Sequence, residues 1–332
     1  MYKRTEQTNK VAHSSAMCLH KGETFLTFYV CPNEGWQQQV VVLRKVKDGW
    51  EKILTLPQGT GNPVLISIKD NLYLAYSMFK PGTEEIKNVP FLWKNVDMFV
   101  AVIGQVYNNG SGTNIEYPHW KYKNVAYFQN LCPRISALEF RGHNSALLPV
   151  YDETFGSGYV ITFHVSNHQG TRDNYTIGRH SMMYTQHISL IQPSLYLYTG
   201  SMHFEARNFG ARGNVFGIGG TWNSESRNWS VGKRDDLTNY RESVLLFTKS
   251  DVLYRVYGDK PNRTELSIGK VNNNGIKKLN ELQHGCYPNY LNNEDDTFTI
   301  CFTEYNSRLS ERTQITLITM NDKLETINKE QV

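Results

Sequence analysis

Short apolar runs that alternate with polar residues recur along the whole chain, separated by Gly, Asn, Asp and Pro. Long stretches with the helical spacing of about 3.6 residues are absent, so the pattern predicts an all-β protein. One unit recurs: a short apolar strand, a polar turn, and a second strand rich in aromatic residues. The second strands start near six residues, namely Phe25, Leu72, Ala146, Met202, Val252 and Thr297.

The spacing of these units predicts a six-bladed β-propeller. The mean period of about 55 residues suits four short strands with their connections, which is the size of one blade. We expect a single domain over residues 1–332, with blades over roughly 11–58, 59–130, 131–190, 191–241, 242–285 and 286–328. The alternative is a β-sandwich, but a sandwich gives no reason for one hairpin to recur at this spacing. A closed ring also leaves fewer exposed strand edges.

Composition and charge narrow the possible partners. The net charge is +4 and no Lys/Arg block occurs, so we expect no nucleic-acid partner. No apolar run approaches the roughly 18 residues of a membrane span, which predicts no membrane insertion. Residues 1–7 lack the apolar core of a signal peptide, so we expect synthesis in the cytoplasm. A role outside the cell would then need another route, for example incorporation in a virus particle.

The cysteines and histidines argue against a metal site. The chain has five Cys, and none forms a C-x-x-C pair or has a His at zinc-finger spacing. Most lie beside apolar residues and predict reduced thiols in a core. The spacing of His180, His187, His203 and His284 does not support joint ligation. We therefore expect no metal and no cofactor.

Unusual residues lie where a propeller places its binding site. The starts of the first strands and the ends of the second strands open onto one face around the central channel, so residues of different blades converge there. The candidates at the starts of first strands are Asn62, Arg134, Gln192 and Tyr287. The candidates at the ends of second strands are Glu34, Tyr76, Tyr151, Asp152, Glu153, Arg207, Tyr257, Tyr305 and Arg308.

These residue types together suit a carbohydrate ligand. Sugar rings stack on aromatic faces, sugar hydroxyls pair with carboxylates, and an acidic sugar pairs with Arg. A structural interpretation competes for each residue, because a Tyr at a strand end often packs a rim and an acid after a strand is commonly a solvated turn residue. Arg207 fits that interpretation less well, since it ends a strand where sibling repeats carry Tyr. The prolines beside several first strands suit strand starts.

Several segments, in order along nearly the whole chain, resemble the sialidase-like superfamily, also called bacterial neuraminidase repeat proteins, in its branch with degenerate repeats. The matching segments are residues 33–36, 62–65, 148–153, 191–195, the strand with Arg207, 256–257, 263–266 and 287–288. The resemblance implies a six-bladed propeller, in agreement with the repeat count. The family's turn motif S-x-D-x-G-x-x-W has no intact copy here; worn versions are residues 47–50, 166–170, 226–229, 274–275 and 321–322.

The resemblance also implies a set of catalytic residues that this chain matches only in part. Sialidases hold the sugar carboxylate with three arginines, beside a Tyr/Glu nucleophile pair and an Asp acid. The first of these arginines stands in an R-I-P context in the first blade, and residues 11–31 contain nothing like it. Arg207 and Arg308 are candidates for two of the three, with Arg134 as a displaced third.

Two functional hypotheses stand at this point. The first is a non-catalytic propeller that binds glycan or forms one subunit of a larger assembly, such as a virus particle; the worn motifs and the incomplete arginine set favour it. The second is an exo-acting glycoside hydrolase on an acidic sugar, with Glu153 and Glu34 as acid/base candidates and Asp152 after them. Tyr305 beside Glu304 is a possible nucleophile pair, although neighbouring strand residues point to opposite faces.

Overall fold

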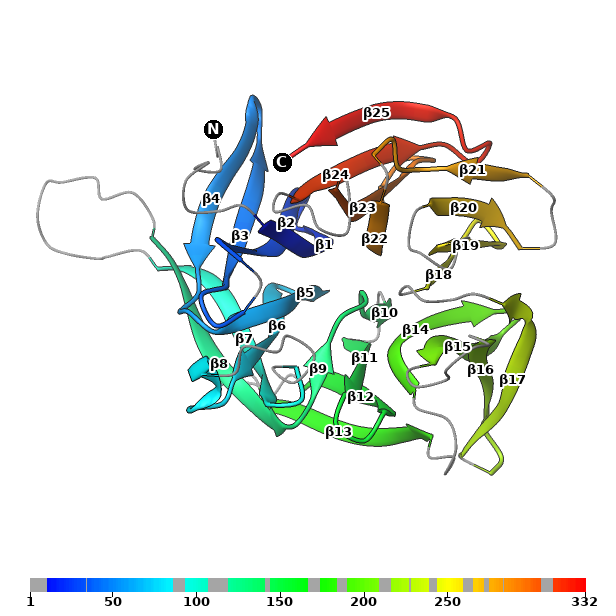
Figure 1. The fold of residues 1–332 in the computed structure, drawn as a ribbon, viewed down its shortest axis with the longest axis horizontal. Coiled ribbons are helices and arrows are strands. Elements are labelled where there is room, and N and C mark those ends of the chain that lie inside the picture. Colours follow the sequence, from blue (N-terminus) through cyan, green and yellow to red (C-terminus); the bar gives the residue numbers. More distant parts are fainter. Residues whose placement is uncertain are drawn as a thin grey trace, which may run out of the picture.

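The chain folds into six antiparallel β-sheets arranged around a central axis, which confirms the predicted all-β, six-bladed propeller (Figure 1). The computed structural model describes residues 11–33, 35–85, 93–106, 119–140, 144–166, 174–183, 190–208, 216–226, 228–238, 244–258, 265–271, 275–282, 284–305 and 313–332. Each sheet, called a blade here, is built from strands that follow one another in sequence.

Blades 1 to 3 come from the first half of the chain. Blade 1 consists of β1 (Val11–His20), β2 (Glu23–Cys31), β3 (Gln39–Val46) and β4 (Gly49–Thr55). Blade 2 consists of β5 (Thr60–Ile68), β6 (Asn71–Phe79), β7 (Val96–Val106) and β8 (His119–Gln129), with the 3-10 helix η1 (Thr83–Glu85) after β6. Blade 3 consists of β9 (Cys132–Pro133), β10 (Leu138–Phe140), β11 (Ser145–Asp152), β12 (Ser157–Ser166) and β13 (Asn174–Met183).

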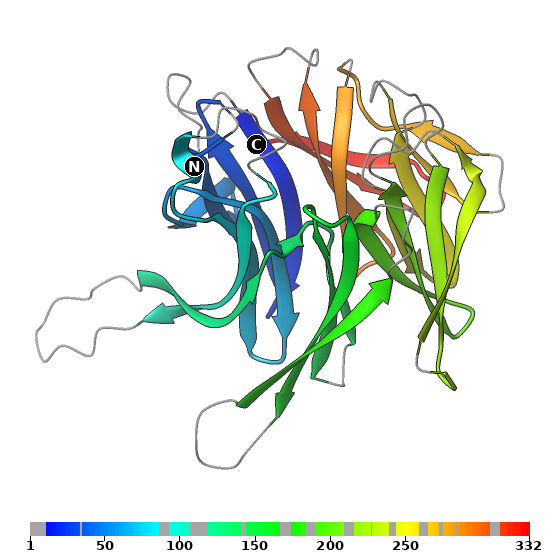
Figure 2. The same cartoon turned by 60° about the horizontal axis from the view of Figure 1, so that its bottom comes forward.

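Blades 4 to 6 complete the ring. Blade 4 consists of β14 (Leu190–Tyr198), β15 (Ser201–Asn208), β16 (Phe216–Asn223) and β17 (Asn228–Thr238). Blade 5 consists of β18 (Leu245–Lys249), β19 (Val252–Gly258), β20 (Leu266–Lys270) and β21 (Ile276–Lys278). Blade 6 consists of β22 (His284–Asn292), β23 (Phe298–Tyr305), β24 (Thr313–Met320) and β25 (Thr326–Gln331). The hairpins β7–β8 and β12–β13 extend away from the ring on one side (Figure 2).

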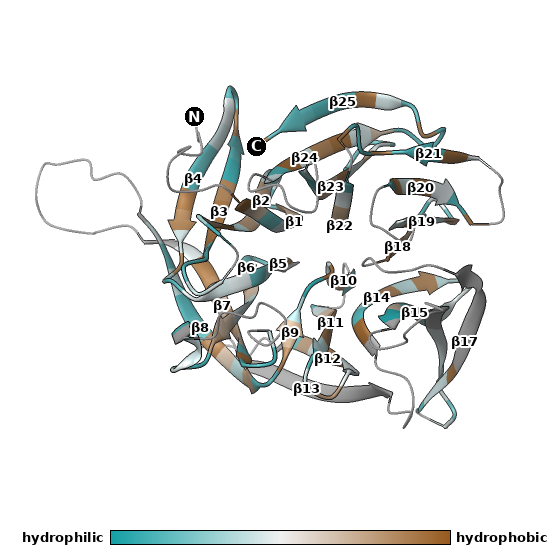
Figure 3. Cartoon of the chain, viewed as in Figure 1, coloured by the Kyte–Doolittle hydropathy of each residue, from teal (hydrophilic) through white to brown (hydrophobic). Residues whose placement is uncertain are grey.

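The hydrophobic core is divided among the junctions between blades. Among the described residues, four clusters of buried apolar side chains each join two neighbouring blades, including blade 6 to blade 1. A fifth extends from blades 1 and 2 to residues of blades 3 and 4, and a sixth joins blades 5 and 6 with Ile135 of blade 3. Apolar side chains on both faces of the inner strands supply these clusters, which is why β2 and β23 are buried almost throughout. The outermost strand β25 is mostly exposed and hydrophilic (Figure 3).

The first strands of blades 1, 2, 4 and 6 share a one-residue bulge at the equivalent point. The pairing with the second strand shifts there by one residue in all four blades. One residue of each bulge has a positive φ: Ser14 (59°), Asn62 (46°), Gln192 (54°) and Tyr287 (59°). Three of the four precede a proline, which normally keeps its predecessor extended. Such backbone strain tends to gather at functional sites.

Blade 3 departs from this pattern because its first strand is broken. β9 and β10 both pair with β11, and residues 134–137 lie between them without strand pairing. This break places the segment from Arg134 to Ala137 at the centre of the ring, where blade 3 faces blade 6 (Figure 1). Among the described residues, no helix is long and apolar enough to cross a membrane.

Candidate functional site

Five predicted residues gather near the axis on the face predicted to bind ligand, and we call them the axial cluster: Asn62, Arg134, Tyr151, Gln192 and Tyr287. The guanidinium carbon of Arg134 lies 3.4 Å from the centre of the Tyr287 ring, so the cation stacks on the aromatic face. Arg134 Nη1 donates a hydrogen bond to Asn62 Oδ1. The side chains of Tyr151 and Gln192 share a hydrogen bond. Four blades therefore contribute to one group of residues.

Burial sets the charges in the axial cluster. Arg134 is only 5% exposed. Burial alone would lower its pKa, but the nearby phenols of Tyr287, Tyr151 and Tyr29 leave it raised, so the guanidinium keeps its charge. Burial raises the pKa of Tyr151 well above its usual value, and the neighbouring Cys132 and Glu153 raise it further. The cluster thus presents one permanent cation among neutral phenols, an arrangement that suits an anionic group.

Two aromatic residues that the sequence did not single out support Tyr287. His13 packs edge-on against the Tyr287 ring with ring centres 4.5 Å apart, and Tyr29 packs against His13 at 5.6 Å. Both rings are buried. The sequence held a weak signal for His13, which directly precedes Ser14. Ser14 occupies the bulge position that Asn62, Gln192 and Tyr287 occupy in the sibling repeats.

A set of hydrogen bonds across the axis lies beneath the axial cluster. The backbone N and the hydroxyl of Ser136 both donate to Asn289 Oδ1, at 2.6 and 2.7 Å. Asn289 Nδ2 donates to the carbonyl oxygens of Ser15 at 2.8 Å and Arg134 at 3.1 Å. Blade 3 and blade 6 are therefore bonded to each other across the channel.

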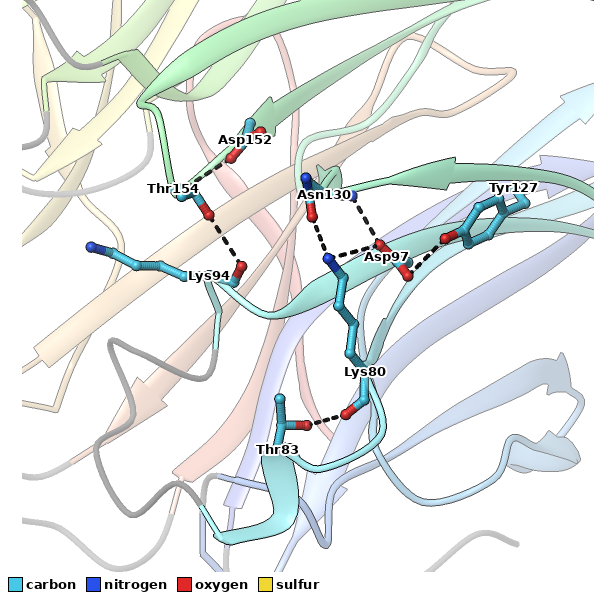
Figure 4. Close-up of polar contacts among 8 residues, drawn as sticks. All are labelled: Lys80, Thr83, Lys94, Asp97, Tyr127, Asn130, Asp152 and Thr154. Carbon is cyan, nitrogen blue, oxygen red and sulfur yellow. Dashed lines mark hydrogen bonds and ion pairs between the residues drawn. The ribbon is translucent and has the colours of Figure 1, made fainter.

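Glu153 and Asp152 follow the same strand but have different surroundings. Glu153 is half-buried and close enough to Cys132 and Tyr151 to raise the pKa of both, so it borders the axial cluster. Asp152 is buried, and its Oδ1 accepts hydrogen bonds from the backbone N of Thr154 at 2.8 Å and Phe155 at 3.3 Å. Thr154 Oγ1 in turn donates to the Lys94 carbonyl at 3.1 Å (Figure 4). These bonds make Asp152 a turn-forming residue.

Three predicted tyrosines have their described contacts elsewhere. The Tyr76 hydroxyl donates to Asn124 Oδ1 of the same blade at 3.0 Å, and burial raises its pKa to about 12. Tyr257 packs on the apolar cluster between blades 4 and 5. Tyr305 stacks on His284 at 5.0 Å within blade 6.

The remaining candidates are placed only in part. Arg207 lies on β15 opposite Ile191, next to the bulge residue Gln192. Its backbone therefore lies beside the axial cluster. Glu34 and Arg308 lie outside the described residues.

Two buried acids that could be mistaken for catalytic groups already have partners. Glu304 Oε1 accepts hydrogen bonds from the backbone N of Glu281 at 2.6 Å and Leu282 at 3.0 Å, and Oε2 accepts one from Thr316. Glu205, which the sequence did not single out, forms an ion pair at 2.8 Å with Arg255 of the next blade. Among the described residues, no three His, Cys, Asp or Glu side chains gather as a metal site requires.

Comparison with known proteins finds likeness in fold only. No protein-family model matches the chain, and no curated protein matches it in sequence. Trypanosoma rangeli sialidase matches with a TM-score of 0.58 and 13% identity, over 93% of this chain and 55% of the other. A mutant of that sialidase displaying trans-sialidase activity gives 0.59 and 11%, over 96% and 57%. The same sialidase in complex with sialic acid gives 0.54 and 12%, over 92% and 54%.

These matches show that the fold is sialidase-like. The chain spans little more than half the length of the sialidases it matches, and the identities are low. The resemblance to the degenerate-repeat branch stays a prediction. The roles of individual residues therefore depend on this chain's own contacts.

Proposed function

We propose that this chain is a carbohydrate-binding propeller whose axial cluster holds the acid group of a sugar. One observation carries the proposal: the Nε of Arg134 is buried and has no hydrogen-bond partner among the described residues, while the guanidinium is fixed by Tyr287 and Asn62. A buried donor without a partner costs about 1–3 kcal/mol, and a ligand carboxylate would remove that cost. The likeness to sialidases, one of them in complex with sialic acid, points to the same class of ligand.

The acid and phenol groups favour recognition over cleavage. A tyrosine nucleophile needs a lowered pKa or an adjacent general base; burial raises the pKa of Tyr151, so its activation would have to come from a base such as the neighbouring Glu153. Asp152 and Glu304 are engaged in backbone hydrogen bonds. Glu153 is the residue that keeps an exo-acting hydrolase as the second candidate, because it is half-exposed and close to Tyr151. That the chain is one subunit of a larger assembly, such as a virus particle, stays a prediction.

A glycan array with acidic and neutral sugars tests the binding proposal. We expect wild-type protein to bind acidic glycans, and Arg134→Met to lose at least about tenfold in affinity, since removing a buried charge contact costs more than 1.4 kcal/mol. Arg44→Met, at a surface ion pair of blade 1, is the matched control and should bind normally. Equal binding of neutral glycans, or undiminished binding by a folded Arg134→Met, would contradict the proposal.

A panel of fluorogenic glycosides separates recognition from hydrolysis. We expect no turnover of acidic or neutral glycosides by protein that binds acidic glycans on the array. Turnover that disappears in Glu153→Gln, with circular dichroism unchanged, would instead establish the hydrolase and assign Glu153 to it.

A further inference from the structure

A cavity of about 700 Å³ occupies the end of the central channel opposite the axial cluster. The first strands of all six blades line it, through residues such as Leu19, Leu65, Ala137, Leu195, Phe247 and Tyr290. Its mouth lies at the turns between first and second strands, where Thr199 and Asp251 are exposed. The volume falls in the range of about 300–1,000 Å³ that small-ligand sites occupy.

The bonds between Ser136 and Asn289 separate this cavity from the axial cluster. Ser136 and Ala137 line the cavity, whereas the side chain of Arg134, two residues earlier, stacks on Tyr287 in the axial cluster. Asn289 binds both Ser136 and the Arg134 carbonyl, so it lies between the two. A ligand in the cavity would therefore meet a different set of side chains from one at the axial cluster.

The cavity walls combine aliphatic and aromatic side chains. Phe247 stacks on Tyr290 with ring centres 4.5 Å apart, and Tyr196 stacks on His203 at 5.3 Å, so these rings are held in place. Tyr290 and Tyr198 are partly exposed to the cavity side of the channel. Fixed aromatic rings bury the apolar body of a ligand and attract a cation at their faces.

The charged residues of the lining are all acidic. Among the described residues, the lining includes Glu139 and Asp251 and no Lys, Arg or His. The carboxylate of Glu139 is positioned by the backbone N of Ser67, which donates to Oε1 at 2.7 Å. The nearby Lys249 is not a lining residue, and its Nζ is engaged by the lining residue Asn292 at Oδ1 and by the carbonyls of Asp295 and Thr297. An anion would be repelled here and a cation attracted.

We propose that this cavity binds a small organic ammonium ion, that is, an amine carried on an apolar body. The apolar part packs among the aromatic and aliphatic walls, and the ammonium group lies toward Glu139 and Asp251. This site is separate from the proposed glycan site in place and opposite to it in charge preference, so either proposal can fail without the other.

Isothermal titration calorimetry with three probes of one shape tests the charge preference. The probes are 2-phenylethylammonium, the neutral 2-phenylethanol and the anionic 3-phenylpropanoate. We expect the ammonium probe to bind about tenfold or more tightly than the alcohol, and the anion not to bind. Absence of binding by the ammonium probe, or binding of the anion as tight as that of the cation, overturns the proposal.

Variants locate the binding. We expect Asp251→Asn and Glu139→Gln each to weaken the ammonium probe several-fold while leaving the alcohol unchanged, because each removes one charge and keeps the shape. Asp296→Asn, an exposed acid on the same face outside the lining, is the matched control. Ala137→Phe, which fills the cavity, should abolish binding of both probes; if it does not fold, the charge variants decide alone. Unchanged affinity in both charge variants overturns the proposal.

Discussion

At the scale of single residues, hydrogen-bond partners decide which buried polar groups serve structure and which can serve a ligand. Glu304 is fully buried, and its carboxylate joins the connection between blades 5 and 6 to β23 and β24. Arg134 is almost as buried, yet one of its nitrogens has no protein partner among the described residues. Both oxygens of the Glu304 carboxylate therefore have protein partners, whereas Arg134 keeps one donor for the ligand that we propose.

Replacing Glu304 should therefore destabilise the fold without altering ligand chemistry. Glu304→Ala leaves the buried Thr316 hydroxyl and the backbone N–H groups of Glu281 and Leu282 without their acceptor, at about 2–4 kcal/mol in the free energy of unfolding. Urea denaturation measures this loss. Glu225→Ala, on an exposed turn, is the control and should change stability little. A Glu304→Ala variant as stable as wild type would contradict the assignment.

The buried thiols predict a loss of stability at high pH. Burial raises the pKa of Cys132 and Cys301 from the ordinary 9.0 to about 12. Above pH 9 the unfolded thiols lose their protons and the folded ones keep them, so a contribution that is fully present below pH 9 declines as pH rises. Each thiol should cost up to about 1.4 kcal/mol per pH unit in this range.

Denaturation at pH 8 and pH 10 measures this dependence. A Cys132→Ala, Cys301→Ala double variant should show a shallower decline between these pH values than wild type, whatever its stability at pH 8. Parallel pH profiles for the two proteins would count against buried, neutral thiols.

At the scale of elements, the first strands combine a strained bulge at one end with a tight turn at the other. The turn after β14 holds Thr199 at φ 49° and Gly200 at φ 77°. A β-branched residue is poorly suited to a positive φ, whereas Asn followed by Gly is the preferred pair for such a hairpin. The equivalent turn of blade 1 holds Lys21 at φ 52° before Gly22.

Thr199→Asn should stabilise the protein by about 0.5–1 kcal/mol, because it relieves strain at an exposed turn without removing a buried contact. Thermal unfolding measures the gain. Thr248→Asn, on a strand instead of a turn, should lose stability under the same conditions. A destabilising Thr199→Asn would show that the Thr199 hydroxyl bond to the Tyr198 carbonyl outweighs the backbone strain.

At the scale of the whole molecule, the ring closes through side chains between its first and last blades. Thr313 Oγ1 accepts a hydrogen bond from Ala12 N at 2.8 Å and donates one to Ala12 O at 2.6 Å. On the outer edge, Trp50 Nε1 and Lys45 Nζ both donate to the carboxylate of Glu330. An apolar cluster joins the same two blades between these contacts.

Thr313→Val should weaken this closure, because it leaves both polar backbone groups of Ala12 buried without partners. We expect a loss of about 2–3 kcal/mol in the free energy of unfolding. Hydrogen exchange should show faster exchange of β1 and β24 amides than of blade 3 amides. Thr55→Val, exposed on blade 1, is the matched control. Equal exchange in all blades would contradict a closure that depends on Thr313.

The sequence predicted the architecture because its internal repeats can be recognised directly from the pattern of apolar residues. Six recurrences of one apolar pattern indicated six blades, and the equivalent position in several repeats indicated Asn62, Gln192 and Tyr287 as neighbours near the axis. Strand alternation depends on local patterning, which a single chain displays directly.

Contacts between blades were harder to predict, since they depend on side-chain geometry. Tyr76 and Tyr257 lie near strand ends as Tyr151 does, but their side chains point elsewhere. Tyr76 bonds within its own blade, and Tyr257 packs between blades 4 and 5. Asp152 and Glu153 are adjacent acids, and only the turn that follows decides which one caps backbone N–H groups. The pair Glu205 and Arg255 lies 50 residues apart in sequence, without a local pattern to join them.

The bond between Ser136 and Asn289 has a mechanical consequence for the ring. If each blade contacted only its two neighbours, all six blades could move outward together and widen the central channel. A tie between facing blades 3 and 6 opposes that expansion, because any increase in diameter must first break it. The ring should therefore keep a constant diameter at the level of Ser136 and Asn289.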